Sequence, residues 1–419
     1  MRHLYSFLLY LLTPFVLLRL LWKGRQLREY WQRIPERLGH VPAAPDGIAV
    51  WVHAVSVGES MAALPLIKRL AAQHPAGSVL VTTTTPTGSA RVQAALGGQV
   101  RHTYVPYDLP HVVARFLDRM RPRCAIVMET ELWPNLFRAL AARRIPLIVA
   151  NARLSPRSFA GYGRIRGFIG GVLGDCTAIA AQSEADAARF RELGADPARV
   201  HVVGNLKFDF ELPAEQVARG RELRDKLGAA RPAWIAASTH EGEEEFALNA
   251  HRILLKRFPD ALLILVPRHP QRFEAVAAQV EKTGLTWLRR SRLDGGPTVT
   301  PQVLLGDSMG ELIMFFAATD VAFVGGSLVD IGGHNVLEPA ALGLPVLFGR
   351  HMFNFEAART LLLEQGAARQ LEDALALAPA VTALFGDQQR RAAMGKAGRD
   401  AIAANRGALD RLEALLARL

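Results

Sequence analysis

Short apolar runs alternate with helical stretches along most of the chain, a pattern typical of doubly wound α/β folds. In the first half, the runs predicted as strands span 48–52, 78–83, 124–128, 147–150, 178–181 and 200–203. In the second half, they span 234–237, 262–266, 303–305, 321–324 and 346–348. The two series predict two open parallel sheets.

A polar, charged stretch at 211–231 separates the two series, and we expect a linker there. The linker divides the chain into a Rossmann-like domain at 23–210 and a second one at 232–400. Residues 401–419 carry a stripe of leucines at helical spacing, Leu409, Leu412, Leu415, Leu416 and Leu419. This stripe predicts a C-terminal helix that packs back on the protein rather than binding a partner.

The N-terminal segment from Leu4 to Trp22 is almost wholly apolar and about as long as a bilayer core requires. Basic residues follow this run between Lys23 and Arg37, whereas a secretory signal carries its charge ahead of the run. We therefore expect residues 1–22 to be a membrane anchor, with the rest of the chain in the cytoplasm by the positive-inside rule. A helix buried against the first domain is an alternative that Pro14 and Arg19 keep open, and a helix lying in the membrane interface is another.

Composition narrows the class of protein. A chain of 419 residues with 50% hydrophobic residues predicts more than one domain with a large core, and disorder is not expected. The two cysteines, Cys124 and Cys176, stand on apolar segments without metal-ligand spacing, so we expect packing roles and a reducing compartment. The formal net charge of +11 predicts an acidic partner: nucleic acid, an anionic membrane or a phosphorylated substrate.

A glycine-rich segment, 325–339, follows the apolar run at 321–324 and opens a predicted helix. Its two glycine pairs would let backbone amides approach an anion, and a helix N-terminus adds partial positive charge. Glu338 then stands in the first turn, where a carboxylate can accept hydrogen bonds from sugar hydroxyls. The segment predicts a nucleotide-sugar pocket, with a plain tight loop as the alternative.

Ligands of parallel sheets bind at the carboxyl ends of the strands, so the residues after each strand are candidates for chemistry. In the first series, Glu59 stands in a glycine-containing turn, where favourable interaction with a helix dipole is an alternative role. Glu129 and Glu131 follow the third strand, and in an extended segment they should point the same way. Lys207 follows the last strand, where a surface lysine is the usual alternative.

The second series supplies possible anion-binding groups. Pro267, Arg268 and His269 end a strand, and an arginine fork suits a phosphate or carboxylate. The backbone of 308–310 could hold an oxyanion or a base edge, although a capping box with Glu311 explains the same residues. His240 also follows a strand, and we expect the acidic residues after it to be solvated.

Together these motifs resemble one family. In chain order they are Val57-Gly58-Glu59, Glu129-Thr130-Glu131-Leu132-Trp133-Pro134, Gly204-Asn205-Leu206-Lys207-Phe208-Asp209, Pro267-Arg268-His269 and Gly332-Gly333-His334-Asn335-Val336-Leu337-Glu338-Pro339. The set resembles the 3-deoxy-D-manno-octulosonic acid (Kdo) transferases of lipopolysaccharide synthesis, over nearly the whole chain. The resemblance implies an α/β GT-B glycosyltransferase, with two Rossmann-like domains facing a cleft and an N-terminal membrane-anchoring helix.

The implied activity is inverting transfer of Kdo from CMP-Kdo to a lipid A precursor, lipid IVA, at the cytoplasmic face of a Gram-negative inner membrane. The partners would be this donor, this acceptor and the anionic membrane surface, with no nucleic acid. The first domain would bind the acceptor and the second the nucleotide sugar. Members that add one Kdo unit and members that add two would share these motifs.

The resemblance also implies roles for particular residues. Glu59 would be the general base, with Glu129 and Lys207 supporting the transition state. The donor site would comprise Pro267, Arg268, His269, Ser308, Met309, Gly310, Gly333, Asn335, Val336, Leu337 and Glu338. In that set, Glu338 would hold the ribose and the 308–310 backbone the cytosine or phosphate. The leaving group carries one phosphate and the sequence has no Asp-X-Asp motif, so we expect neither a metal nor another cofactor.

Two other readings come from different classes of protein. Another membrane-associated GT-B nucleotide-sugar enzyme, such as a peptidoglycan-precursor transferase or a UDP-sugar epimerase, would share the glycine-rich loop and Glu338. It would not predict Glu59 and Glu129 in their contexts. A membrane-bound binding protein for nucleotides or polyanions would also fit the basic charge, and a catalytic carboxylate distinguishes an enzyme from such a protein.

Overall fold

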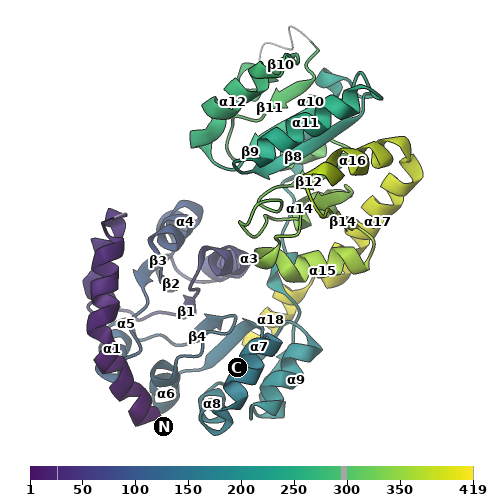
Figure 1. Ribbon diagram of the computed structural model, residues 1–419. Coiled ribbons are helices and arrows are strands. Elements are labelled where there is room, and N and C mark those ends of the chain that lie inside the picture. The colour runs from purple at the N-terminus through teal and green to yellow at the C-terminus, as the bar shows by residue number, and fades with distance from the viewer. Residues whose placement is uncertain (26, 294–299, 419) are drawn as a thin grey trace. The chain divides into compact units, whose positions relative to one another are not determined.

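The computed structural model describes residues 1–25, 27–293 and 300–418. The chain forms two compact units. The N-terminal unit comprises residues 1–210 and 405–419, and the C-terminal unit comprises residues 211–404. In the described residues of each unit, seven parallel strands form one sheet, and helices cover its faces (Figure 1).

The sheet of the N-terminal unit has the strand order β3-β2-β1-β4-β5-β6-β7. Its strands are β1 Val50–His53, β2 Val79–Thr83, β3 Arg101–Tyr104, β4 Ala125–Met128, β5 Leu147–Ala152, β6 Ala178–Ala181 and β7 Val200–Val202. Its helices are α1 Arg2–Lys23, α2 Ile34–Arg37, α3 Val57–Gln73, α4 Pro86–Leu96, α5 Pro110–Met120, α6 Pro134–Ala142, α7 Pro156–Gly163, α8 Arg166–Leu173, α9 Glu184–Glu192 and α18 Ala408–Leu416.

The sheet of the C-terminal unit has the order β10-β11-β9-β8-β12-β13-β14. Its strands are β8 Ala233–Thr239, β9 Leu262–Pro267, β10 Trp287–Arg289, β11 Val303–Leu305, β12 Val321–Val324, β13 Val346–Phe348 and β14 Ala368–Gln370. Its helices are α10 Ala214–Leu227, α11 Glu243–Leu255, α12 Phe273–Lys282, α13 Leu312–Ala317, α14 Leu337–Leu342, α15 Glu356–Glu364, α16 Leu377–Gly386 and α17 Gln388–Asn405.

The first strand of each unit lies in the interior of its sheet and carries a fully buried tryptophan. Trp51 on β1 pairs in register with Leu80 of β2 on one side and with Ala125 of β4 on the other. Trp234 on β8 similarly lies between β9 and β12. In the N-terminal sheet β2 and β3 lie on one side of β1, and the chain then restarts with β4 on the other side. In the C-terminal sheet β9, β10 and β11 lie on one side of β8, and the chain restarts with β12 on the other. Each change of side creates a topological switch point, one beside β1 and one beside β8.

All eleven predicted strands are present, with ends within two residues of those predicted. The sequence pattern missed β3, β10 and β14, which lie at sheet edges. These strands are less apolar because one side of an edge strand has no neighbouring strand; β3, for example, reads Arg-His-Thr-Tyr. An apolar run therefore identifies an interior strand better than an edge strand.

The stretch at 211–231 contains helix α10, where we expected a linker. Leu223 and Leu227 of this helix are buried in the core of the C-terminal unit. Gly220 lies so close to α13 that a Cβ atom there would stand 2.4 Å from the carbonyl oxygen of Met314. The charged residues of this stretch cover the outer face of a packed helix, which explains why the stretch read as polar.

Of the leucines predicted to form the C-terminal stripe, Leu409, Leu412 and Leu415 are buried in the core of the N-terminal unit and Leu416 packs against it, while Leu419 lies outside the described residues. Leu409 and Leu412 of α18 belong to the same buried cluster as Val203 and Leu206. The carboxylate of Asp209 accepts hydrogen bonds from the backbone N–H groups of Gly407 and Leu409, at 2.6 and 2.5 Å. The chain thus returns to its first unit after completing the second.

Helix α1 has 22 residues and a mean hydropathy of 1.9, and within the described residues it alone is long and apolar enough to cross a membrane. Only 6% of its most apolar window is buried. This low burial contradicts the alternative of a helix buried against the first domain, since only one face of α1 contacts that unit.

His251 predicts that stability falls in acid. Its ring is fully buried, accepting a hydrogen bond from Trp234 Nε1 at 3.2 Å and contacting the carbonyl oxygen of Gln302 through Nε2 at 2.9 Å. Burial lowers the pKa of His251 to about 4, so stability present above pH 6.5 is lost as the pH falls. From pH 7 to 5, this histidine should cost about 2 kcal/mol of unfolding free energy.

Urea unfolding of the His251→Phe variant at both pH values tests this expectation. The loss of the Trp234 partner should lower stability about equally at the two pH values, so the difference between them isolates the titration. The exposed His40→Gln variant is the control and should keep the wild-type difference. An unchanged pH difference in His251→Phe would contradict the assignment.

Candidate active site

Glu59 lies in the first turn of α3, just beyond the carboxyl end of β1. Its carboxylate accepts hydrogen bonds from Val55 N–H at 2.8 Å and from Ser56 Oγ at 2.9 Å, while Glu59 N–H donates to Ser56 Oγ at 3.2 Å. This reciprocal arrangement is a variant of the capping box, in which the carboxylate reaches the backbone N–H of Val55 rather than that of the N-cap Ser56. Glu59 therefore has the structural role that we gave as the alternative, and this role leaves room for a catalytic one.

The environment of Glu59 favours a protonated carboxyl. The residue is only 9% exposed, and burial is the main cause that raises its pKa above the usual range. The hydrogen bonds from Val55 and Ser56 oppose this shift, and the negative charges of Glu129 and Glu131 add to it. A carboxylate whose proton affinity is raised is better suited to accept a proton near neutral pH.

Glu129 directly follows β4 and adopts a left-handed backbone conformation with φ 55°. The extended segment that we expected at 129–131 is wrong, because this turn breaks the alternation of side chains. Glu129 Oε1 lies 3.2 Å from Lys207 Nζ, and both side chains are partly exposed. The structure therefore brings together Glu59, Glu129 and Lys207, the three residues expected to be catalytic, at the carboxyl edge of one sheet.

Two polar residues near this edge escaped the sequence analysis. His53 ends β1, is 1% exposed, and within the described residues its Nε2 has no hydrogen-bond partner. Burial lowers the pKa of His53 to about 4, so its ring is neutral at pH 7. Asn151, with φ 53°, accepts a hydrogen bond from Leu206 N–H at 3.0 Å and so ties β5 to the segment of Lys207. Both residues stand at or near the end of a strand, and this position could have identified them from the sequence.

In the C-terminal unit, Glu243 is an organising residue that the sequence analysis misjudged. The acidic residues after His240 were expected to be solvated, but Glu243 and Glu244 are 0% exposed. The carboxylate of Glu243 accepts hydrogen bonds from four backbone N–H groups, those of His240, Gly326, Ser327 and Leu328, at 2.6 to 3.1 Å. Glu244 is buried because it pairs with Arg272, whose Nη2 lies 3.1 Å away.

This arrangement changes the role of the first glycine pair. The amides after β12 hold the resident carboxylate of Glu243, so the anion that we expected them to approach is part of the protein. A Cβ atom at Gly325 would stand 2.8 Å from Glu243 Oε2, and Gly326 has φ 66°. The second pair is also packed closely, since a Cβ atom at Gly333 would stand 2.2 Å from Met352 Sδ.

Three histidines gather with Arg268 at the switch point beside β8. The rings of His240 and His334 stack with centroids 5.0 Å apart, and their Nε2 atoms are 2.8 Å apart. His269 contacts His240 edge to face at 5.3 Å. Burial lowers the pKa of His334 to about 4, and the positive charge of Arg268 adds to this effect. At pH 7 His334 is neutral, and Arg268 supplies the permanent positive charge.

The segment after these histidines leads into α14. Asn335 Oδ1 accepts a hydrogen bond from Leu337 N–H at 3.0 Å, while Val336 and Leu337 are buried. Burial raises the pKa of Glu338, and a hydrogen bond with Asn335 offsets part of the shift. The predicted donor residues Arg268, His269 and 333–338 thus follow strands β9 and β12, which flank β8.

The third predicted donor segment, Ser308–Gly310, follows β11. Gly310 has φ 80°, and Met309 is 56% exposed. The alternative capping box does not form: α13 begins at Leu312 with Glu311 as its N-cap, and no side chain caps it. Instead, Glu311 accepts a hydrogen bond from Ser308 Oγ at 2.6 Å and pairs with Arg219 at 2.5 Å.

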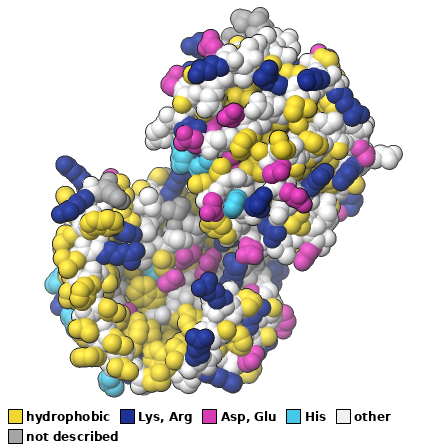
Figure 2. Space-filling view, in the orientation of Figure 1, with side chains coloured by type: hydrophobic (Ala, Val, Ile, Leu, Met, Phe, Trp, Pro, Cys, Tyr) yellow, Lys and Arg dark blue, Asp and Glu magenta, His cyan; other side chains and the backbone are white. Residues whose placement is uncertain are grey.

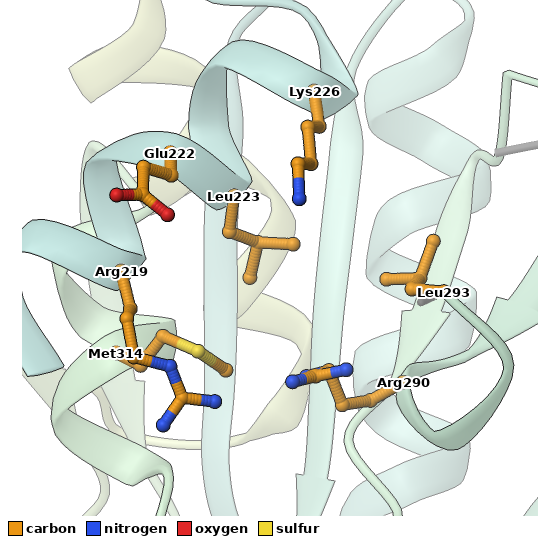
Figure 3. A pocket seen from close by; sticks show the side chains of 7 residues that line it. All are labelled: Arg219, Glu222, Leu223, Lys226, Arg290, Leu293 and Met314. Carbon is orange, nitrogen blue, oxygen red and sulfur yellow. The ribbon is translucent and has the colours of Figure 1, made fainter. Parts of the chain in front are cut away.

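A hollow of about 180 Å³ lies elsewhere in this unit, between α10, α13 and the short helix η6 Arg290–Arg292 (Figure 3). Arg219 and Arg290 line it, and both pair with Glu311. None of its lining residues belongs to the predicted donor set. Among the residues that the structure describes, no group of three or more His, Cys, Asp or Glu is placed to hold a metal ion.

The family model described as 3-deoxy-D-manno-octulosonic-acid transferase (kdotransferase) matches residues 32–210. A 3-deoxy-D-manno-octulosonic acid transferase from Haemophilus influenzae is 44% identical over 418 residues, covering 99% of this chain and 98% of that protein. One from Bordetella pertussis is 40% identical over 434 residues, with the same coverage of 99% and 98%.

Among solved structures, a UDP-GlcNAc 2-epimerase from Neisseria meningitidis superposes with a TM-score of 0.57 at 14% identity. The match covers 88% of this chain and 100% of that one. A glycosyltransferase from Rickettsia africae has a TM-score of 0.55 at 13% identity, covering 88% and 98%. At such identities the likeness shows the fold alone, which is of the GT-B type with two parallel α/β domains.

Proposed function

The chain belongs to the 3-deoxy-D-manno-octulosonic-acid transferase family, and on that premise we propose that it moves Kdo from CMP-Kdo to the lipid A precursor lipid IVA, with inversion at the anomeric carbon. Kdo transfer in lipopolysaccharide biosynthesis follows from the family. The donor nucleotide, the acceptor and the stereochemical course go beyond it. The observation that carries the proposal is the buried carboxylate of Glu59 beside Glu129 and Glu131 at the switch point of β1.

Glu59 would act as the general base. The acceptor hydroxyl would give its proton to the Glu59 carboxylate while its oxygen attacks the anomeric carbon of Kdo. The bond from that carbon to the phosphate oxygen breaks, and its electron pair leaves with CMP. Attack on the face opposite the leaving group inverts the configuration. The raised pKa of Glu59 supports this role, since burial and two neighbouring carboxylates favour uptake of a proton.

Glu129 and Lys207 would assist through charge. Lys207 Nζ, 3.2 Å from Glu129 Oε1, could offset the negative charge of the sugar carboxylate or of the leaving phosphate. Glu129 would hold the lysine in place or stabilise the positive charge that develops on the sugar ring. The left-handed turn at Glu129 fixes the carboxylate directly at the end of β4.

The donor would bind at the carboxyl edge of the C-terminal sheet. Arg268 offers a planar fork for the single phosphate of CMP, and His269 stands next to it. Glu338 would accept hydrogen bonds from the ribose, and the backbone of 308–310 would contact the cytosine or the phosphate. One phosphate carries less charge than a diphosphate, so these groups would suffice without a bound metal.

The place of action that we propose is the cytoplasmic face of the inner membrane. Helix α1 has the length and hydropathy of a membrane segment, and Lys23, Arg25 and Arg28 follow or end it as a basic collar. The collar and the formal net charge of +11 suit an anionic lipid surface.

Two donor-site variants should weaken CMP binding. Arg268→Ala and Glu338→Ala each remove a group that would bond the nucleotide, so each should lose about 1 to 3 kcal/mol of binding free energy. Calorimetry with CMP measures this loss. Arg252→Ala, at an exposed position on α11, is the matched control and should bind CMP normally.

Calorimetry with UDP in place of CMP separates this proposal from another GT-B nucleotide-sugar enzyme. We expect heat of binding for CMP and much less for UDP. Preference for UDP, or unchanged CMP affinity in both donor-site variants, would place the nucleotide elsewhere and contradict the proposal.

A further inference from the structure

Helix α1 has two different faces. One carries large apolar side chains that are 42% or more exposed: Leu4, Phe7, Leu8, Leu11, Leu12, Phe15, Val16, Leu18, Leu21 and Trp22. The opposite face is partly or fully buried at Arg2, Ser6, Leu9, Thr13, Leu17 and Leu20, positions separated by three or four residues. Such spacing makes one continuous stripe along a helix, so α1 lies against the N-terminal unit over its whole length.

The docked face is held by polar contacts. Tyr5 donates its hydroxyl hydrogen to Asp108 Oδ2 at 3.0 Å, and Ser6 Oγ donates to Asn135 Oδ1 at 3.0 Å. The ring of Tyr10 stacks on His111, with its hydroxyl 2.6 Å from Nδ1. Asp108 also accepts hydrogen bonds from two backbone N–H groups at the start of α6, so this anchoring point is part of the folded unit.

The first turn of α1 lies on the body of the unit, and its last turn contacts the segment that follows it. At its first turn, Met1 and Arg2 line a hollow of about 390 Å³ together with Arg138 of α6 and Phe168 of α8. At its last turn, Trp31 Nε1 donates a hydrogen bond to the carbonyl oxygen of Leu21 at 2.8 Å. A helix that crossed a bilayer would carry Arg2 to the far side, away from Arg138.

A spanning helix would have to abandon these contacts or draw charged groups of the unit into hydrocarbon. Asp108 and His111 belong to the N-terminal unit, and placing a carboxylate at the bilayer centre costs at least about 3 kcal/mol. The apolar face of α1 is nevertheless exposed, and no other part of the described chain shields it from water. An exposed apolar surface of this kind marks a contact with a membrane or another protein. Figure 2 shows these hydrophobic side chains as a band where α1 lies in Figure 1.

We propose that α1 lies in the plane of an anionic phospholipid membrane, with its apolar face among the outer acyl segments and its polar face on the N-terminal unit. The occupant of the face is a lipid surface because basic residues stand at its C-terminal end: Arg19 is exposed within the face, Lys23 lies in the last turn, and Arg25 and Arg28 follow the helix. The inference rests on the proposed membrane location and goes further by fixing the helix orientation. It keeps the N-terminus on the same side of the membrane as both units.

Cysteine labelling tests which side holds the N-terminus. The background protein carries Cys124→Ala and Cys176→Ala, and a single cysteine is introduced as His3→Cys or as Leu375→Cys, the second being 84% exposed on the C-terminal unit. A membrane-impermeant maleimide is applied to spheroplasts and to inverted inner-membrane vesicles. We expect both cysteines to react in inverted vesicles and neither in spheroplasts. Labelling of His3→Cys in spheroplasts, with protection in inverted vesicles, would overturn the proposal.

Depth quenching gives an independent measurement. Phe7 and Leu18 are 64% and 61% exposed and lie on one face, because eleven residues complete just over three helical turns. A bimane probe at Phe7→Cys or Leu18→Cys should sit at equal depth, about 5 to 10 Å below the headgroups, when brominated lipids act as quenchers. An upright helix would separate the two depths by about 16 Å. Neither readout needs sugar transfer, so a failure of the proposed activity would leave this test intact.

Discussion

Replacing Glu59 by glutamine should lower the rate of Kdo transfer by roughly two to four orders of magnitude, the usual cost of losing a general base. Glutamine keeps the size of the side chain and can complete the capping box with Ser56, so the fold and CMP binding should survive. Single-turnover rates and CMP calorimetry on the same preparation measure both effects.

Asp186→Asn is the matched control for this change. Asp186 stands at the equivalent position of α9, exchanges hydrogen bonds with the N-cap Ser183, and accepts one from Leu154 N–H at 2.9 Å. It is 7% exposed, close to the 9% of Glu59. A structural role alone would make the two variants behave alike. Equal, near-normal rates in both would therefore leave Glu59 as a helix cap and nothing more.

The pH profile of the wild-type enzyme should also show the ionisation of Glu59. Because burial raises the pKa of Glu59, the acid limb of kcat/KM should lie above the ordinary glutamate value of 4.5. Activity should therefore rise with pH through that limb as the carboxylate ionises. The limb should disappear from the residual activity of Glu59→Gln.

Replacing Glu243 by alanine should have the largest effect on stability, lowering the unfolding free energy by about 4 kcal/mol or more. The change leaves the backbone N–H groups of His240, Gly326, Ser327 and Leu328 without their shared acceptor in a buried site. Each buried unsatisfied donor costs about 1 to 3 kcal/mol, with partial relaxation reducing the sum. CMP affinity should fall as well, since the same loop leads to the predicted donor residues.

Urea unfolding monitored by circular dichroism tests this expectation. Glu245→Ala, two residues further along α11 and exposed, is the control for removing an acidic residue from the first helical turn. A wild-type unfolding midpoint for Glu243→Ala would show that water or the backbone replaces the carboxylate at little cost. In that case Glu243 would not organise the loop.

The interior of both sheets could be predicted because a parallel strand buried on both faces is a continuous apolar run. Edge strands such as β3 and β14 could not be predicted, because a few mixed residues suffice where one side has no neighbouring strand. Helix α10 was mistaken for a linker because its buried stripe is narrow and its other positions are charged. Apolar continuity therefore predicts the core of this fold and not its periphery.

The candidate site was predictable where a functional side chain directly follows a strand, as with Glu129 and Arg268. The role of Glu243 was not predictable, because three successive glutamates at a helix start interact favourably with the helix dipole without any other partner. Three of its four backbone partners, Gly326, Ser327 and Leu328, stand more than 80 residues further along the chain, and only the fold brings them together with Glu243. The stacked pair of His240 and His334 was hidden for the same reason.

The most direct test of the central claim is transfer of labelled Kdo by the purified protein from CMP-Kdo, generated in situ, to lipid IVA. We expect the wild-type protein to form a labelled lipid product, Asp186→Asn to form it at a similar rate, and Glu59→Gln to form almost none while still binding CMP. A wild-type protein that binds CMP but transfers no Kdo to lipid IVA, or a Glu59→Gln variant that transfers it at the wild-type rate, would contradict the account.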